Sequence, residues 1–156
     1  MSLIIRPALA TDAHAIGNLA RQFAGYLRSL GDLSEFNLTA ERYLQDGFGT
    51  QPAFSGIVGE DNGKVVGYLL YHFGYDSDAA VRNLHVVDLY VDQNSRRQGA
   101  GTALMRAAAE IALAGGAVEL IWSVYRPNTL AAEFYERLGA QRISNLFFMT
   151  LRADAL

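Results

Sequence analysis

Two arginines and two glycines, Arg96, Arg97, Gly99 and Gly101, lie close together after an apolar run at residues 84–91. The first turn of a helix leaves backbone N–H groups without partners and carries the positive end of the helix dipole, so anions bind there. Glycine lets the backbone approach a ligand, and planar guanidinium groups suit phosphate oxygens. The pattern predicts a diphosphate site at a helix that begins near Gly101. An ordinary strand-to-helix turn with solvated arginines is the alternative.

Two common phosphate-binding loops do not fit this stretch. A P-loop requires Gly-Lys-Ser/Thr, whereas Gly101 is followed directly by Thr102. A dinucleotide-binding loop requires glycine or alanine where this chain has Leu104, and an acid at the end of the next strand. Glu119 lies inside the following apolar run instead of at its end.

Composition sets outer limits on the function. A chain of 156 residues with 51% hydrophobic residues predicts a single domain over residues 1–156. The formal net charge of −3 favours a small cationic partner and gives no basic surface for nucleic acid. The chain has no cysteine, and its three histidines do not have metal-ligand spacing, so no metal is expected. With no signal-peptide pattern or transmembrane-length run, we expect a soluble cytoplasmic protein without a membrane partner.

The first third of the chain predicts a strand followed by two helices. Residues 3–6 form an apolar run that Pro7 ends, which is typical of an edge strand. Thr11 or Asp12 can cap a helix whose apolar residues recur with helical period. Thr39 predicts the cap of a second, shorter helix that ends at residues 47–49. The irregular segment between these helices, residues 29–36, is a candidate lining for a substrate cleft.

The remainder predicts alternating strands and helices. Asn62-Gly63 between apolar runs at residues 54–60 and 64–73 is typical of a β-hairpin. A loop at 74–83, a strand at 84–91, the helix after the arginines and a strand at 118–124 imply a parallel crossover. Pro127-Asn128-Thr129 predicts another helix, and residues 141–151 predict a final strand. This order predicts an α/β fold with a mixed sheet and helices on both faces.

Several spaced motifs together resemble one enzyme family. They are Asp88-Leu89-Tyr90-Val91, Arg96-x-x-Gly99-Ala100-Gly101, Trp122-Ser123-Val124, Asn128, and Phe134-Tyr135 before Leu138-Gly139-Ala140. With Gly47-Phe48-Gly49 and Gly63 to Tyr68, they resemble the GNAT superfamily of N-acyltransferases, and within it the spermidine/spermine acetyltransferase branch. The resemblance implies a mostly antiparallel sheet with a splayed, parallel central strand pair, acetyl-CoA as the acetyl donor, and a homodimer.

The resemblance also implies which residues hold acetyl-CoA. The pantetheine arm would lie along Leu89, Tyr90 and Val91, with a backbone N–H near Leu89 polarising the thioester carbonyl. The residues matching the pyrophosphate loop are Arg96, Arg97, Gln98, Gly99, Ala100, Gly101 and Thr102. Asn128 and Tyr135 would contact the same cofactor from the last helix.

Tyr135 is the predicted catalytic acid. Attack of an amine on a thioester releases a thiolate whose conjugate acid has a pKa of about 8.5, and a tyrosine of pKa about 10 can protonate it. The alternative is a half-buried ring beside the apolar stripe of the last helix, with its hydroxyl in solvent.

Asp88 is the predicted base, because an alkylammonium must lose a proton before it attacks. We expect it to act through water; alternatively it only hydrogen-bonds a neighbouring loop. His85 titrates in a useful range but more often such a histidine is a packing residue.

The chain departs from the polyamine branch at two positions. That branch usually has two adjacent acids where this chain has Val87-Asp88, and an aromatic residue where this chain has Arg126. A missing acid and an added arginine favour an amine that also bears a carboxylate, such as a lysine-like amino acid. Diamines or polyamines, protein or peptide acceptors, and a non-catalytic acyl-CoA-binding module remain alternatives.

Overall fold

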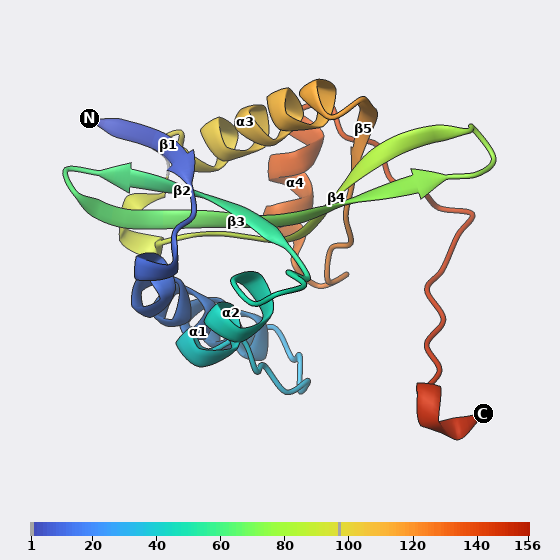
Figure 1. The fold of residues 1–156 in the computed structure, drawn as a ribbon, viewed down its shortest axis with the longest axis horizontal. Helices are drawn as coiled ribbons and strands as arrows, with labels where there is room; N and C mark the ends of the chain where they lie inside the picture. Colours follow the sequence, from blue (N-terminus) through green and yellow to red (C-terminus); the bar gives the residue numbers. More distant parts are fainter. Residues whose placement is uncertain (1, 97) are drawn as a thin grey trace.

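A five-stranded sheet forms the centre of the protein, in the order β1-β2-β3-β4-β5 (Figure 1). The computed structural model describes residues 2–96 and 98–156. The strands are β1 (Leu3–Pro7), β2 (Ser55–Asp61), β3 (Lys64–Asp76), β4 (Val81–Val91) and β5 (Ala117–Ile121). The first four pair antiparallel, and β4 pairs parallel with β5. The predicted mixed sheet is confirmed, with the parallel pair at one end of the described strands.

Helices cover both faces of the sheet, as predicted (Figure 1). Helices α1 (Ala13–Ser29) and α2 (Ala40–Gly47) lie on one face, and α3 (Ala100–Ala114) and α4 (Thr129–Arg137) on the other. The strands alternate between two cores: Tyr68 packs with α1 and α2, whereas its neighbour Leu69 packs with α3. This alternation follows from the two-residue period of a β-strand.

Local sequence signals account for the first half of the fold. Thr39 caps α2, its hydroxyl accepting a hydrogen bond from the backbone N–H of Arg42 at 3.2 Å. Asn62 and Gly63 both have positive φ angles, 51° and 81°, as the predicted two-residue hairpin turn requires. The predicted edge strand at the N-terminus is also confirmed, as β1.

The predicted loop at residues 74–83 is wrong. Strands β3 and β4 continue through most of it and form a long two-stranded ribbon (Figure 1). The turn is tight because the Asp76 carboxylate accepts hydrogen bonds from the backbone N–H groups of Asp78 and Ala79. Because the end of this ribbon is exposed on both faces, its strand residues do not alternate between apolar and polar. Residues 74–83 therefore have the composition of a loop, although most of them belong to strands.

The predicted strand at residues 141–151 is also wrong. None of these residues belongs to a strand, and the segment leaves the body of the molecule (Figure 1). Strand β5 is shorter than predicted as well, ending at Ile121 instead of residue 124. The absent strand and the shortened β5 have the same cause. Whether a segment forms a strand depends on a neighbouring strand to pair with, and the sequence of the segment alone does not specify that neighbour.

No helix within the described part of the chain is both long and apolar enough to cross a membrane.

Candidate active site

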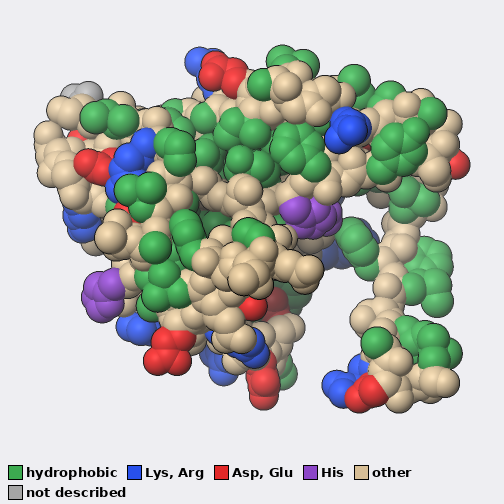
Figure 2. All heavy atoms as spheres, viewed as in Figure 1, with side chains coloured by type: hydrophobic (Ala, Val, Ile, Leu, Met, Phe, Trp, Pro, Cys, Tyr) green, Lys and Arg blue, Asp and Glu red, His purple; other side chains and the backbone are tan. Residues whose placement is uncertain are grey.

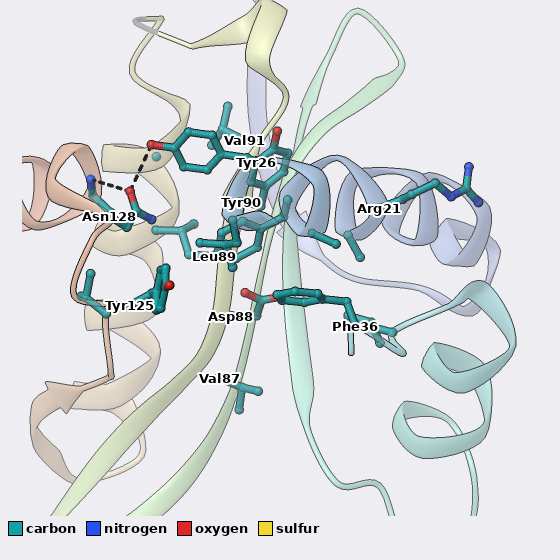
Figure 3. Close-up of a pocket in the computed structure, with 18 of the residues that line it drawn as sticks. Arg21, Tyr26, Phe36, Val87, Asp88, Leu89, Tyr90, Val91, Tyr125 and Asn128 are labelled. Carbon is teal, nitrogen blue, oxygen red and sulfur yellow. Dashed lines mark hydrogen bonds between the residues drawn. The ribbon is translucent and has the colours of Figure 1, made fainter. Parts of the chain in front are cut away.

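One cleft of about 1050 Å³ brings most of the predicted site residues together. Its walls come from α1, the segment between α1 and α2, the second half of β4, the start of α3, residues 123–125 and α4 (Figure 3). Glu35 and Phe36 line it, which supports the expectation that the irregular segment after α1 borders a cleft. The volume is at the upper end of the range for a single small ligand, so two substrates can be accommodated together.

The cleft opens where β4 separates from β5. Their parallel pairing runs from Arg82 to His85 on β4 and ends opposite Ile121. Strand β4 continues to Val91 without β5 beside it. A β-bulge lies at the same level, because Tyr71 of β3 faces Val86 while Leu70 faces Asp88. The backbone from Leu89 to Val91 pairs with β3 on one side and has no described strand on the side facing β5, so this edge forms a wall of the cleft, as the splayed pair predicts.

The two loop glycines serve different purposes. Gly99 has a φ of +84°, a left-handed conformation that residues with a side chain rarely adopt. A Cβ on Gly101 would lie 3.1 Å from the Phe134 ring, so this glycine allows α3 to approach α4 closely. Gly99, Ala100, Gly101 and Thr102 line the cleft. Arg97 lies outside the described residues, and Gln98 is exposed and does not line the cleft.

Arg96 lies between two aromatic rings. Its guanidinium carbon is 5.4 Å from the centre of the Tyr26 ring and 5.2 Å from that of Tyr90. Its Nε also donates a hydrogen bond to the carbonyl oxygen of Val91, at 3.3 Å. These contacts hold the cation at the cleft wall.

Asn128 is buried and caps α4. Its Oδ1 accepts hydrogen bonds from the Ala131 backbone N–H, at 3.3 Å, and from the Tyr26 hydroxyl, at 3.2 Å (Figure 3). The side chain is therefore fixed from two directions, and its amide nitrogen is the group left to act as a donor.

Asp88 is the acid at the centre of the cleft wall. The Tyr68 hydroxyl donates a hydrogen bond of 2.6 Å to its Oδ2, and Phe36 lines the same cleft (Figure 3). Burial raises the pKa of Asp88 to about 6, although hydrogen bonds from Tyr68 and from the Leu89 backbone favour the ionised form. The carboxylate is thus a stronger base than an exposed aspartate and is mostly ionised at pH 7.

Tyr135 lines the same cleft from α4. Its ring packs against Trp122 and Phe134, with centroids 4.8 and 5.2 Å apart. Burial and the negative charge of Asp88 raise the pKa of Tyr135 to about 12. The phenol therefore carries its proton at neutral pH and is able to donate it.

His85 and Arg126 do not line the cleft. His85 stacks on His72 of the neighbouring strand, with ring centroids 4.9 Å apart, and burial lowers its pKa. These contacts agree with the alternative that His85 is a packing residue and not part of the site. Arg126 is exposed. No cluster of three potential metal ligands occurs among the described residues.

Comparison with known proteins agrees with this geometry. The Acetyltransferase (GNAT) family matches residues 19–140. The chain belongs to this family. It is therefore a GNAT N-acetyltransferase, and the family uses acetyl-CoA as its acetyl donor.

Among the relatives of this GNAT protein is a thialysine N-epsilon-acetyltransferase from Bos taurus, 35% identical over 150 residues, covering 91% of this chain and 86% of that protein. A human spermidine/spermine N(1)-acetyltransferase-like protein 1 is 30% identical and covers 90% of this chain and 21% of that protein. An integron cassette protein from V. cholerae, 22% identical, shares the fold with a TM-score of 0.80, covering 99% of this chain and 94% of that one.

Sequence analysis missed two residues that hold site side chains in place. Tyr68 donates a hydrogen bond to Asp88, and Tyr26 donates one to Asn128. Tyr68 lies in an apolar strand run that predicts only core packing. Its hydroxyl could have been linked to Asp88 only if the register between β3 and β4 had been known.

We predict that Tyr68→Phe shifts the pH dependence of the GNAT enzyme. Removing the Tyr68 hydroxyl takes away a donor that favours the ionised Asp88 carboxylate, so the pKa of Asp88 rises further above about 6. The acidic limb of kcat/KM against pH should move to higher pH, with activity retained above pH 8. A limb that stays in place would contradict this role for Tyr68.

We also predict that Asp88→Asn stabilises the fold. At pH 7 the folded state holds a carboxylate whose pKa is raised from 3.8 to about 6, whereas asparagine has no such cost and still accepts the Tyr68 hydrogen bond. The free energy of unfolding should rise by roughly 3 kcal/mol above pH 6. The gain should vanish as the pH falls towards 4, because folded Asp88 then becomes protonated. Denaturant titrations at several pH values test both parts.

Proposed function

We propose that this GNAT protein acetylates a small primary amine, and that the side-chain amine of a lysine-like amino acid is the best candidate acceptor. The main support is that Asp88 and Tyr135 face one cleft at the point where β4 leaves β5. The name of the thialysine N-epsilon-acetyltransferase relative supports the class of acceptor.

The described residues suit acetyl-CoA. The start of α3, at Gly99 to Thr102, would hold the pyrophosphate, with Arg96 beside it. The backbone edge of Leu89, Tyr90 and Val91 that faces away from β3 would hold the pantetheine arm, with the amide of Asn128 as a further donor. When bound, acetyl-CoA supplies the acetyl group as an activated thioester.

Asp88 and Tyr135 would then move protons in opposite directions. The amine nitrogen bonds to the acetyl carbon while the carbon–sulfur bond breaks, which gives an amide and a thiol. Asp88 receives the proton of the ammonium group through water, because only the free amine attacks. Tyr135 gives its phenolic proton to the departing sulfur, and the second proton that the nitrogen loses as it becomes an amide restores the phenol.

Among the charged residues that line the cleft, Arg21 favours an acceptor with a carboxylate, while Glu35 and Asp88 suit its ammonium groups. Arg21 lines the acceptor side from α1, on the same side of Asp88 as Phe36 (Figure 3). A polyamine carries only positive charges and would be repelled by this arginine, whereas a carboxylate would be attracted. Both arginines are exposed, but only Arg21 lines the cleft, so we assign to Arg21 the role that the sequence suggests for Arg126.

The other expectations about partners stay proposals. We propose a cytoplasmic homodimer with no nucleic-acid or membrane partner, supported by the net charge of −3 and by the apolar C-terminal segment that the structure leaves exposed.

Tyr135→Phe tests the proposed acid. Since general acid catalysis typically contributes 100-fold or more, kcat for thiol release should fall by about that factor, with KM for acetyl-CoA little changed. Tyr71→Phe, on another partly buried tyrosine outside the cleft, is the matched control. Unchanged turnover in Tyr135→Phe would remove this residue from the chemistry.

Arg21→Ala tests the proposed acceptor. Loss of a charge-assisted contact should raise KM for lysine or thialysine by roughly 10- to 100-fold. The matched diamine without the carboxylate, 1,5-diaminopentane, should not be affected in this way. Arg126→Ala serves as the control arginine and should leave both acceptors unchanged.

A panel of acceptors separates the remaining functions. Preference for spermidine over every amino acid would favour a polyamine enzyme, and preference for a lysine-containing peptide would favour a protein acetyltransferase. No thiol release with any amine would favour a non-catalytic acyl-CoA-binding module. Each result would overturn the proposed acceptor.

A further inference from the structure

A single side chain of α1, Tyr26, contacts residues on both sides of the gap between β4 and β5. Its hydroxyl donates the 3.2 Å hydrogen bond to Asn128 at the start of α4, and Figure 3 shows the two side chains joined in this way. The same ring lies 5.4 Å from the guanidinium carbon of Arg96, in the loop after β4. Tyr26 therefore connects a residue that follows β4 with a residue that follows β5.

Helix α1 is fixed against β4 by neighbouring side chains. The Phe23 ring stacks on Tyr90 with centroids 5.1 Å apart and 18° between the ring planes, and the Tyr90 hydroxyl donates a hydrogen bond to Gln22 at 3.4 Å. Phe23 and Tyr26 are three positions apart, so they lie on one face of the helix. Charged side chains gather over α1 and α2 in Figure 2, as expected for helices whose other face packs on the sheet. The inner face of α1 thus holds the Tyr26 ring in place.

The Asn128 amide depends on Tyr26 for its orientation. A backbone N–H can only donate, so the hydrogen bond from Ala131 identifies the atom it meets as the amide oxygen. At 3.3 Å this bond is longer than most N–H···O hydrogen bonds, so it holds the side chain weakly. The Tyr26 hydroxyl donates to the same oxygen and fixes the amide from a second direction. Without that hydroxyl, the orientation of the amide would rest on the long contact with α4.

We propose that Tyr26 is a positioning residue for acetyl-CoA, because it sets the distance between Arg96 and Asn128. The proposal rests on the proposed function, in which these two residues hold the cofactor from opposite sides of the gap. Tyr26 acts through them: its hydroxyl orients the Asn128 amide, and its ring holds the Arg96 guanidinium at the cleft wall. A ligand that meets donors already in place loses less free energy to ordering the protein, so Tyr26 contributes to affinity for the cofactor.

Two substitutions separate the two contacts of Tyr26. Tyr26→Phe keeps the ring beside Arg96 and removes the hydroxyl, so the Kd of acetyl-CoA, measured by isothermal titration calorimetry, should rise about 3- to 10-fold. Tyr26→Leu removes the ring as well and should raise the Kd roughly 10- to 100-fold. In steady-state assays both losses should fall on KM for acetyl-CoA and not on kcat. Tyr43→Phe is the matched control: it removes a hydroxyl that donates to the Leu9 carbonyl, outside the cleft, and should leave the Kd unchanged.

Double-mutant cycles show whether Tyr26 acts through its two partners. In an Asn128→Ala background, Tyr26→Phe should have no further effect on the Kd, because the hydroxyl has lost the group that it orients. In an Arg96→Gln background, the difference between Tyr26→Phe and Tyr26→Leu should disappear for the same reason. Effects that persist in full in both backgrounds would overturn the proposal, as would a Tyr26→Phe variant with the Kd of the wild type.

The binding measurement also separates this proposal from the proposed function. Calorimetry needs no acceptor, so a failure to acetylate any amine leaves the test of Tyr26 intact. If Asn128→Ala and Arg96→Gln each weaken binding of acetyl-CoA but the cycles are additive, the cofactor contacts stand and the role of Tyr26 falls. If neither substitution changes the Kd, the assigned cofactor contacts are wrong, and the role of Tyr26 falls with them.

Discussion

Everything in the site depends on the separation of β4 from β5 after His85. A strand with a neighbour on one side only, as β4 has in β3, still has backbone N–H and C=O groups on its other edge that need partners, and an extended ligand can provide them. The gap exists because β5 has only five residues and a bulge re-aims β4 near Val87. Helix α3 follows β4 by a short loop, so its first turn lies at the end of the same gap. The separation of β4 from β5 thus places three parts of the site together: the open backbone edge of β4, the first turn of α3, and Asp88.

The two proposed proton-transfer groups are also linked electrostatically. The negative charge of Asp88 is one of the two causes that raise the pKa of Tyr135, the larger being burial. When Asp88 accepts a proton, that charge disappears and the Tyr135 phenol becomes a better acid. The acid is therefore strengthened by the same event that frees the attacking amine. A buried carboxylate is unfavourable for stability, but here the burial also raises its basicity.

The sequence predicts best what neighbouring residues decide. The Thr39 cap and the Asn62-Gly63 turn are local, and both were placed correctly. Contacts between distant segments were not foreseen: Tyr26 reaches Asn128 across 102 positions, and Tyr68 meets Asp88 only through strand register. The residue types alone pointed to an anion site at the loop, whereas the role of Tyr135 came from the family resemblance, because an isolated tyrosine beside an apolar stripe does not indicate catalysis. The wrong final strand has another origin, since residues 141–151 have strand-like composition but no described strand pairs with them.

Strand β5 positions the opposite wall of the cleft. One edge borders the gap in which β4 diverges, and the segment that follows β5 contributes Tyr125 and Asn128 to the cleft. This five-residue strand pairs with only residues 82–85 of β4, so the sheet alone does not fix the segment after it. The Asn128 side chain is held instead by the Tyr26 hydroxyl from α1 and by the Ala131 backbone N–H of α4. A helix from the start of the chain thus fixes a donor near its end, on the far side of the gap from β4.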